Sequence, residues 1–434
     1  MIEAKLLEWR DHWRRKPLVV RGARQVGKTY SIEKFGREHF ADVIVADLEK
    51  NRAWRSAFED SLGADRVLGA LEVRVGRRIV PGKTLLFLDE VQSCPRAITA
   101  LRYLYEERPE LHVIAAGSLI EFALQDISFP VGRVQLLEMH PMTFEEYLRA
   151  VGHEPALGIV QDAPRPLSAS EHRVLLDQVR TYCFVGGMPE SVAAYVRTQS
   201  LQEAFAVHRE LADVYRQDFA KYAPRADPEC LDATFLGVAQ QVGRQVKYTR
   251  LAGGFAGSTV RRDFDLLCRA RVVHKVPAAS PSGLPLGANA SARRFKALMV
   301  DVGLWQHLCG VKAEMALRAA DVLDVHRGAM AEQFVGQQLL VSQEGSLFYW
   351  SRTARGSSAE VDYLAVMDGQ IYPVEVKSGP AGRLRSMHLC LRSYPNCPGG
   401  LVFSSAPYAE LPRQKLTFLP LYYAGSVTQR TSAG

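Results

Sequence analysis

Short runs of consecutive apolar residues alternate, over the first 150 positions, with stretches whose apolar residues recur at helical spacing. Continuous apolar runs indicate strands buried on both faces of a sheet, and alternating strands and helices indicate a parallel sheet covered by helices. The pattern predicts helices over 3–14, from 28 onward and over 96–107, and strands at 17–21, 43–46, 84–88 and 112–115. We therefore expect residues 1–160 to form an α/β domain with a doubly wound parallel sheet.

Helical periodicity dominates the next segment, which a polar, proline-containing break at 162–168 separates from the predicted sheet. The sequence Gly-Gly-Met-Pro-Glu at 186–190 lies between two predicted helices. Two adjacent glycines permit positive φ angles, and proline suits the first turn of a helix. We expect residues 161–225 to form a helical lid in which this sequence has a structural role.

The rest of the chain predicts two further domains, because 434 residues exceed what one hydrophobic core normally serves. Over 226–310, two short helices around 246–268 precede strands at 271–276 and 295–300, a winged-helix-like pattern. Over 311–434, a helix at 326–340 precedes strands at 347–351, 359–366 and 371–377. A helix followed by a strand meander is how a restriction-endonuclease-like α/β core begins.

The sequence Gly-Ala-Arg-Gln-Val-Gly-Lys-Thr at 22–29 follows the first predicted strand and opens a helix. It fits the phosphate-binding loop G-x-x-x-x-G-K-[ST] in the structural setting that this motif requires. In such a loop, Gly22 and Gly27 let the backbone curl so that its N–H groups face the phosphates, the lysine reaches the β- and γ-phosphates, and the hydroxyl ligates Mg²⁺. The residues predicted to contact ATP here are Gly22, Ala23, Arg24, Gln25, Val26, Gly27, Lys28, Thr29 and the adjoining Tyr30.

The apolar run at 84–88 ends in Asp89-Glu90, which is a Walker B pattern. We predict that Asp89 holds Mg²⁺ and that Glu90 polarises the attacking water, so that the protein hydrolyses ATP and does not only bind it. Ser118 follows the strand at 112–115, where ligands bind in open α/β sheets. Its hydroxyl could contact the γ-phosphate or cap the next helix, and the sequence leaves both open.

Four polar residues in the C-terminal segment follow the order Glu332, Asp362, Glu375, Lys377. Glu375 and Lys377 share one face of the third strand, opposite Asp362 on its antiparallel neighbour. Converging carboxylates could bind Mg²⁺, and the repulsion between them would require a cation, with Lys377 serving the chemistry. The pattern predicts a nuclease site, and a solvated Glu-Val-Lys strand is the alternative.

Basic residues are concentrated between 241 and 300, a segment that contains eleven Lys or Arg and two Asp and therefore has a local net charge of +9. On a winged-helix-like fold this favours phosphate contacts, above all through Arg261, Arg262, Arg293 and Arg294. A winged helix that contacts only protein is the alternative.

These motifs carry a resemblance. The segments 22–29, 85–92, 115–118, 132–134 and 141–148 resemble the prokaryotic AAA-type ATPases that carry an uncharacterised, restriction-endonuclease-like (PD-(D/E)XK) C-terminal domain. The resemblance covers most of the chain and implies that Arg133 is an arginine finger or sensor, with a surface salt bridge as the alternative. It also implies that Glu332, Asp362, Glu375 and Lys377 form the C-terminal site.

Composition adds broader limits. No apolar run approaches the length of a membrane span, no signal peptide is recognisable, and the seven cysteines lack zinc-site spacing, so we expect a cytoplasmic protein without a membrane partner. The net charge of +7 is compatible with a polyanionic partner. The sequence thus predicts a Mg²⁺-dependent ATPase with a nuclease-like domain that binds nucleic acid, DNA favoured, and leaves homo-oligomerisation open. A signalling or scaffold ATPase whose C-terminal domain binds nucleic acid or protein without cleavage is the alternative.

Overall fold

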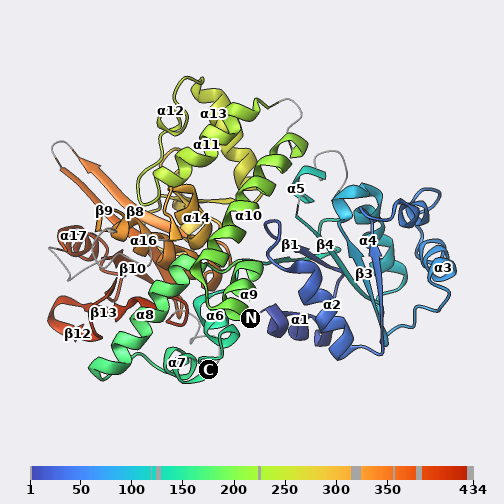
Figure 1. The fold of residues 1–434 in the computed structure, drawn as a ribbon, viewed down its shortest axis with the longest axis horizontal. Coiled ribbons are helices and arrows are strands. Elements are labelled where there is room, and N and C mark those ends of the chain that lie inside the picture. The colour runs from blue at the N-terminus through green and yellow to red at the C-terminus, as the bar shows by residue number, and fades with distance from the viewer. Residues whose placement is uncertain are drawn as a thin grey trace. The chain divides into compact units, whose positions relative to one another are not determined.

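The computed structural model of the chain describes residues 2–118, 120–123, 129–222, 226–313, 324–354, 357–377 and 384–427 (Figure 1). It divides into two compact units. The first comprises Met1–His140 and Arg269–Arg271, and the second comprises Pro141–Cys268 and Val272–Gly434.

The first unit is built on a five-stranded parallel sheet in the order β2-β3-β4-β1-β5. Its strands are β1 (Leu18–Arg21), β2 (Asp42–Asp47), β3 (Thr84–Asp89), β4 (His112–Gly117) and β5 (Gln135–Glu138). The predicted α/β class and the four predicted strands are confirmed. The fifth strand was not predicted, because β5 is an edge strand whose four residues are only partly buried or exposed, so no apolar run marks it.

Helices cover both faces of this sheet (Figure 1). Side chains of α1 (Ile2–Asp11) and α2 (Lys28–His39) pack with Leu85 and Phe87 on one face. Those of α3 (Ala64–Val75) and α4 (Pro95–Glu107) pack with Leu86 and Leu88 on the other. Consecutive residues of a strand point to opposite faces, so a strand apolar at every position needs a helix layer on each side. Three short elements complete the unit: η1 (Arg52–Phe58), η2 (Val91–Ser93) and α5 (Ile120–Ala123).

The second unit begins with helices. They are α6 (Phe144–Ala150), α7 (Glu154–Gln161), α8 (Ala169–Val185), α9 (Pro189–Thr198), α10 (Leu201–Tyr222), α11 (Pro228–Gln240), α12 (Tyr248–Leu251) and α13 (Gly257–Arg269). Two of them start with complete capping boxes, Thr143 with Glu146 and Ser168 with Glu171, which explains where α6 and α8 begin.

The division of the chain into domains at 160, 225 and 310 stays a prediction. The ring of Phe144 on α6 lies 5.8 Å from that of Tyr182 on α8 and 6.0 Å from that of Phe334. Helix α6, which we expected in the ATPase domain, therefore packs inside the second unit.

Two adjacent glycines tie three segments of the second unit together. Gly186 has φ 72°, and the N–H of Gly187 donates to Asp301 Oδ2 at 2.6 Å. A Cβ on Gly187 would lie 2.1 Å from the carbonyl oxygen of Met142, which itself accepts from the hydroxyl of Tyr182. The structural role predicted for these glycines thus rests on close backbone contact as well as on φ.

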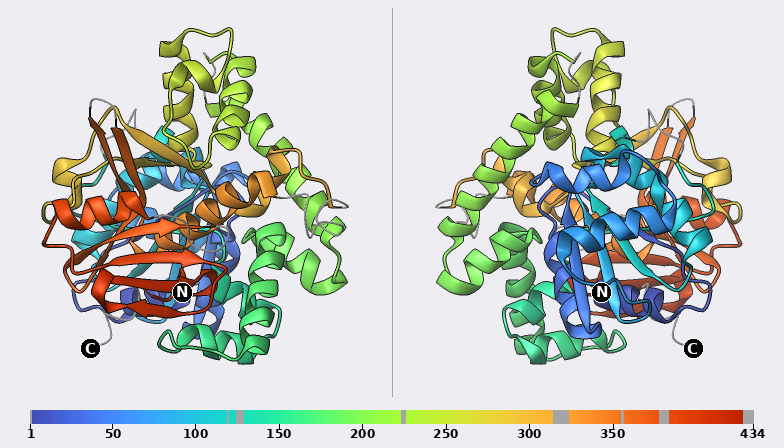
Figure 2. Two further views of the ribbon diagram at one scale, coloured as in Figure 1. Left: turned by 90° about the vertical axis from the view of Figure 1, so that its left-hand side faces the viewer. Right: turned by 90° about the vertical axis from the view of Figure 1, so that its right-hand side faces the viewer.

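The C-terminal half contains a two-stranded and a six-stranded sheet. The first is antiparallel and pairs β6 (Val273–Pro277) with β7 (Phe295–Met299), close to the two strands predicted at 271–276 and 295–300, while the winged-helix assignment stays a prediction. The second, orange to red in Figure 2, has the order β12-β13-β11-β10-β9-β8. Its strands are β8 (Phe348–Ala354), β9 (Ser357–Met367), β10 (Gln370–Val376), β11 (Gly400–Ser404), β12 (Ala409–Leu411) and β13 (Leu416–Pro420). The predicted antiparallel meander is β8-β9-β10, and β11 continues parallel to β10.

The remaining helices in the described part of this half are α14 (Val302–Leu308), α16 (Asp324–Ser342) and α17 (Arg385–Ser393), with one-turn segments η3 (Leu286–Asn289), η4 (Pro412–Gln414) and η5 (Leu421–Tyr423). Leu364 of β9 joins the core around Met387 of α17, whereas the hydroxyl of its neighbour Tyr363 donates to the carbonyl of Glu332 on α16 at 2.9 Å. Helices α16 and α17 therefore contact opposite faces of the sheet.

Buried glutamines of α16 hold the second unit together. The side chain of Gln333 bonds both the N–H and the C=O of Met299 on β7, at 3.0 and 2.9 Å. Gln337 accepts from the N–H of Val302, and Gln338 accepts from the N–H of Phe144. Since these amides replace water for buried backbone groups, they fix α16 to β7 and to α6.

Among the described residues, no helix is both long and apolar enough to cross a membrane. All seven cysteines carry free thiols, and five of them are buried.

We expect Gly187→Ala to destabilise the second unit by roughly 1–3 kcal/mol, because the new methyl group would overlap the carbonyl of Met142. Gly158→Ala on α7 is the control, since its Cβ would meet nothing within 4 Å and alanine favours the helix. Urea denaturation measures both. An unchanged midpoint for Gly187→Ala would contradict the packing described here.

Candidate functional site

The phosphate-loop sequence joins β1 to α2, as predicted, and its backbone is left-handed at two positions. Gln25 has φ 63° and Gly27 has φ 89°. Left-handed residues in such a loop turn successive N–H groups toward one point, which creates an anion-binding concavity. For Gln25 this conformation is uncommon, and an uncommon backbone conformation in a ligand loop marks a functional constraint.

Gly22 is needed for a different reason from the one that the motif suggested. We expected both glycines to serve the curl of the loop, yet Gly22 is not among the glycines with positive φ. A Cβ at this position would lie 2.2 Å from the carbonyl oxygen of Met139, which follows β5. Gly22 therefore lets the loop pass close to a neighbouring backbone, and only Gly27 serves by its φ angle.

The ammonium group of Lys28 is buried and folded back onto the loop. Its Nζ donates to the carbonyl oxygens of Gly22 and Ala23, at 3.1 and 2.8 Å. Burial lowers the pKa of Lys28 to about 8, against the opposing effect of Glu90 and Asp89. A buried cation whose hydrogen bonds go to carbonyl groups would gain strongly from a polyanion, so the loop fits a nucleotide phosphate.

The phosphate-loop sequence and the Walker B pattern meet through a hydrogen bond. The Thr29 hydroxyl donates to Asp89 Oδ2 at 2.7 Å, and Asp89 Oδ1 accepts from the N–H of Glu90 at 2.9 Å. Asp89 is only 4% exposed, and burial raises its pKa to about 6 despite the hydrogen bond from Thr29. Hydroxyl and carboxylate oxygens are the ligands that Mg²⁺ prefers, so this pair fits the cation predicted here.

Glu90 leaves the strand in a left-handed conformation, with φ 50°. Its Oε2 accepts a short hydrogen bond from Gln92 Nε2. Gln92 Oε1 is buried without a hydrogen-bond partner in the described part of the chain and lies where a Cβ of Gly117 would be. Gln92 therefore holds the carboxylate predicted to orient water, beside the end of β4.

Ser118 is buried at the end of β4, and its Oγ also lacks a hydrogen-bond partner among the described residues. As a helix cap, the hydroxyl would accept a backbone N–H from the first turn of the next helix. No such bond is present with the described residues of α5, so the contact with a γ-phosphate stays the prediction for Ser118.

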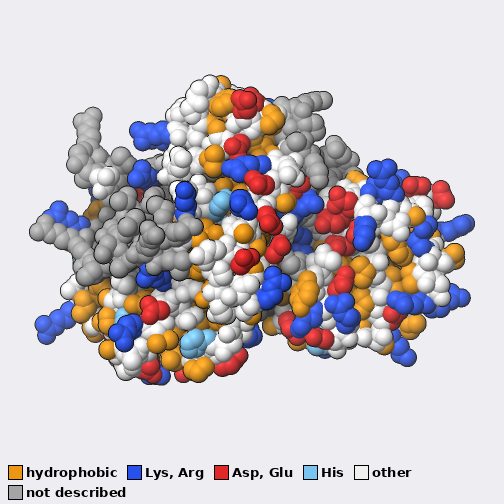
Figure 3. Space-filling model, in the orientation of Figure 1, with side chains coloured by type: hydrophobic (Ala, Val, Ile, Leu, Met, Phe, Trp, Pro, Cys, Tyr) orange, Lys and Arg blue, Asp and Glu red, His pale blue; other side chains and the backbone are white. Residues whose placement is uncertain are grey.

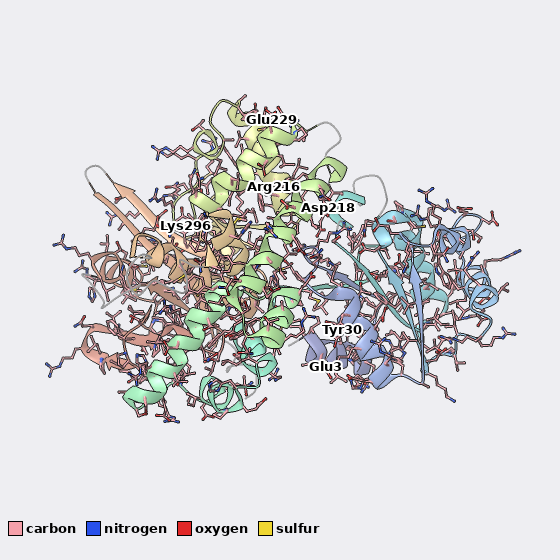
Figure 4. The ribbon with its side chains drawn as sticks, in the orientation of Figure 1. Glu3, Tyr30, Arg216, Asp218, Glu229 and Lys296 are labelled. Atoms are coloured by element: carbon pink, nitrogen blue, oxygen red, sulfur yellow. The ribbon has the colours of Figure 1, made fainter. Side chains whose placement is uncertain are left out.

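The other predicted contacts of the loop divide by exposure. Ala23 and Val26 are buried, Arg24 and Gln25 are half-buried or exposed, and Tyr30 is 69% exposed on the first turn of α2 (Figure 4). The buried side chains of Ala23 and Val26 therefore support the loop. A nucleotide could contact these two residues only through their backbone.

Arg133 lies away from this site. It precedes β5, whose Gln135 is in register with Leu18 at the start of β1, whereas the phosphate loop follows the end of β1. At about 3.3 Å per residue, the three steps from Leu18 to Arg21 separate the two edges by roughly 10 Å. The Nε of Arg133 donates to Glu106 Oε1 of α4 at 2.7 Å. The salt bridge given as the alternative is thus present. The position of Arg133 does not fit an arginine finger or sensor for the nucleotide of the same protomer. That Arg133 acts on the nucleotide of a neighbouring copy stays a prediction.

In the second unit, Glu332 and Asp362 approach each other around a lysine. Lys296 Nζ lies 2.8 Å from Glu332 Oε1, 3.2 Å from Asp362 Oδ1 and 2.6 Å from Glu360 Oε1. Lys296 is 2% exposed. Although burial favours a neutral amine, the three carboxylates raise the pKa of Lys296 well above its ordinary value.

This lysine corrects two expectations. Lys296 is one of the eleven basic residues counted between 241 and 300, but it is buried and cannot contribute to a phosphate-binding surface. We also argued that converging carboxylates would require a bound cation. Lys296 supplies that positive charge from within the protein, so charge repulsion is no reason to place a metal ion there.

Glu375 and Lys377 lie close together, as predicted. Lys377 Nζ is 2.5 Å from Glu375 Oε1, while Glu375 Oε2 is buried without a hydrogen-bond partner among the described residues. Burial and the neighbouring Asp362 raise the pKa of Glu375 to about 7. The second oxygen of Asp362 accepts from the N–H of Val376 at 2.8 Å.

The carboxylates Glu332, Asp362 and Glu375 do not share one ligand position. In the described ranges, the group of three possible ligands with atoms mutually within 4.8 Å is Glu3, Glu38 and His39, on the surface of the first unit. Metal binding by the C-terminal carboxylates therefore stays a prediction.

Sequence reasoning missed four residues that the structure places at these sites. Asp47 is in register with Asp89 at the end of the next strand, and Gln92 holds Glu90. Glu360 and Lys296 complete the C-terminal cluster. The pairing of Lys296 could have been predicted, because it is the one charged residue in the apolar run Phe-Lys-Ala-Leu-Met at 295–299. A lysine in such a run is normally buried and paired with a carboxylate.

The four arginines expected to contact phosphate are all exposed. Arg262 pairs with Asp263 at 3.1 Å, and Arg294 donates to the carbonyl of Ser351 at 3.5 Å. On the face drawn in Figure 3, basic and acidic side chains are interspersed.

Comparison with solved structures finds distant similarity. The ORC1 protein of Aeropyrum pernix in complex with DNA is 12% identical, with a TM-score of 0.28 over 73% of this chain and 92% of that one. ORC of Drosophila bound to DNA is 12% identical, with a TM-score of 0.29 over 71% and 95%. PCH-2 of C. elegans is 13% identical, with a TM-score of 0.26 over 46% and 61%. No curated protein matches the chain.

Three sequence families match successive segments. Residues 176–315 match a domain of unknown function (DUF8612), and residues 327–422 match another (DUF4143). Neither description names a nuclease. Residues 14–148, which include the phosphate loop and the Walker B pattern, match the AAA domain family, so the first part of this chain is an AAA-family domain.

Proposed function

We propose that the first unit binds and hydrolyses ATP with Mg²⁺. The observation that carries this proposal is the hydrogen bond of 2.7 Å between Thr29 and Asp89, because it joins the two motifs that a P-loop ATPase uses for its metal ion. The AAA-family match supports the same activity.

The proposed mechanism assigns one task to each side chain. Lys28 exchanges its bonds to the carbonyls of Gly22 and Ala23 for bonds to phosphate oxygens. Thr29 and Asp89 would hold Mg²⁺, which when bound neutralises charge on the phosphates. Glu90, held by Gln92, orients the attacking water, and the Ser118 hydroxyl donates to a γ-phosphate oxygen.

For the second unit we propose binding without cleavage. The exposed arginines Arg261, Arg262, Arg293 and Arg294 would contact the phosphates of nucleic acid, while Lys296 neutralises the carboxylates that a nuclease would need for metal ions. The chain is then a signalling or scaffold ATPase that binds nucleic acid, with DNA favoured, and homo-oligomerisation stays part of this proposal.

Metal-dependent cleavage is the second candidate, and one observation favours it. Glu375 Oε2 is a buried carboxylate oxygen without a hydrogen-bond partner in the described part of the chain, beside Lys377. A screen of single- and double-stranded DNA and RNA with Mg²⁺ or Mn²⁺, with and without ATP, separates the two candidates. Cleavage that is lost in Lys377→Ala would favour the nuclease.

Glu90→Gln should bind Mg²⁺-ATP near the wild-type affinity and lose hydrolysis by a factor of about 10² or more, since an amide cannot polarise water as a carboxylate does. Lys28→Ala should lose binding itself. Equilibrium binding of a fluorescent ATP analogue and release of phosphate measure the two steps. Wild-type turnover by Glu90→Gln would show that Glu90 is not the base.

Asp89→Asn should stabilise the nucleotide-free protein as the pH rises. A folded-state pKa of about 6 against an ordinary 3.8 means that the native state binds the extra proton, so ionised Asp89 costs stability above pH 6. The difference in unfolding free energy between variant and wild type should grow by about 2 kcal/mol from pH 4 to pH 6.5. Chemical denaturation in EDTA measures it, and a difference independent of pH would contradict the burial of this carboxylate.

Changing Arg261, Arg262, Arg293 and Arg294 to Ala should weaken binding to duplex DNA and reduce its salt dependence. Each lost phosphate contact should reduce the magnitude of the slope of log K against log salt by about 0.9. Arg173→Ala/Arg197→Ala is the control, since both side chains are exposed on other helices of the same unit. An unchanged slope in the fourfold variant would favour a protein partner for this surface.

A further inference from the structure

The ammonium group of Lys296 is surrounded by acidic side chains from two other elements. Lys296 is carried by β7, whereas Glu332 belongs to α16 and Glu360 and Asp362 belong to β9. All three carboxylates lie within 3.2 Å of Nζ. Figure 4 shows Lys296 among the side chains of the second unit. An ammonium group has three N–H bonds, so each of the three carboxylates can receive one.

The position of Lys296 is fixed by the backbone on either side. In the β6–β7 ladder Lys296 pairs with Val276, and three residues later Gln333 of α16 bonds both backbone groups of Met299. Glu332 is the residue next to Gln333, so the ion pair and the amide bonds join the same two elements. Withdrawing Lys296 would require breaking this ladder and the amide bonds together.

Several carboxylate oxygens near Lys296 already have partners within the protein. Asp362 uses Oδ1 for Lys296 and Oδ2 for the N–H of Val376. Glu375, another predicted ligand, is bonded to Lys377 through Oε1, while its Oε2 has no hydrogen-bond partner among the described residues. A divalent cation at this position would have to displace the lysine, and it would meet the repulsion of a fixed positive charge.

We propose that Lys296 is the resident cation of the C-terminal carboxylate cluster: it takes the place of a divalent metal ion and locks the wing strand β7 to α16 and β9. The protein should therefore fold without a metal ion in this half and should not bind one between Glu332 and Asp362. The proposal does not depend on ATP hydrolysis by the first unit.

Removing the lysine tests the proposal, because it leaves three buried carboxylates without their cation. Lys296→Met, measured as the full chain without nucleotide, should have a lower melting temperature than wild type. Mn²⁺ should restore part of that loss and should bind at least about tenfold more tightly than to wild type, as the cluster loses its internal counter-charge. Wild type should show no shift with Mn²⁺ or EDTA that depends on Asp362.

Two further variants make the result specific. Lys275→Met, on the neighbouring strand β6, removes an exposed lysine and should leave Mn²⁺ binding unchanged. Lys296→Met/Asp362→Asn removes one charge of each sign and should lose the response to Mn²⁺. If Lys296→Met does not fold without metal, purification with Mn²⁺ should recover it, and failure of both routes would contradict the proposal.

The proposal is overturned if wild type binds Mn²⁺ with an affinity that Asp362→Asn abolishes, because the cluster would then accept a metal beside Lys296. It is also overturned if Lys296→Met melts like wild type and gains no Mn²⁺ binding. Phosphate release from ATP, measured in the same preparations, reports on the first unit separately.

Discussion

The parallel register of β1, β3 and β4 is the constraint on which the proposed nucleotide site depends. Because these strands are neighbours in the order β3-β4-β1 and run in the same direction, the phosphate loop, Asp89-Glu90 and Ser118 all follow their carboxyl ends at one edge. The bond between Thr29 and Asp89 is possible only in this arrangement. The same register carries Arg133 to the opposite edge. The order and direction of the strands therefore place the phosphate loop, Asp89-Glu90 and Ser118 at one edge of the sheet and Arg133 at the other.

Lys28 and Lys296 are both buried, but their pKa values are shifted in opposite directions. Lys28 is held by backbone carbonyls, and its pKa is lowered because burial outweighs the nearby carboxylates. For Lys296 the carboxylates outweigh burial, and its pKa is raised. The first lysine would therefore gain from an added anion, while the second already has its anions in the folded chain. A cation with unused capacity indicates a ligand site, whereas a cation with satisfied partners indicates a structural one.

The sequence was sufficient to predict elements whose signals are local. Continuous apolar runs predicted β1 to β4, and the glycine, lysine and threonine spacing predicted the phosphate loop, because the motif's geometry is set within eight consecutive residues. The edge strand β5 was missed because its residues are half-buried, and the need for Gly22 was misread because Met139, far along the chain, imposes it. Contacts between distant segments leave no periodic trace in the sequence, so the partners of α16 could not be predicted.

The burial of Lys296 could have been predicted from the apolar residues on either side of it. Counting charges over a segment treats every lysine as exposed, yet a lysine between Phe295 and Ala297 in a fully buried strand has no route to water along that strand. Such a lysine must find carboxylates, and a chain with several carboxylates in later strands supplies them. The carboxylates predicted to bind a metal ion and the lysine counted among the basic residues of 241–300 therefore belong to one buried ion cluster. Before carboxylates in a sequence are interpreted as metal ligands, the lysines that could pair with them in the folded chain have to be considered.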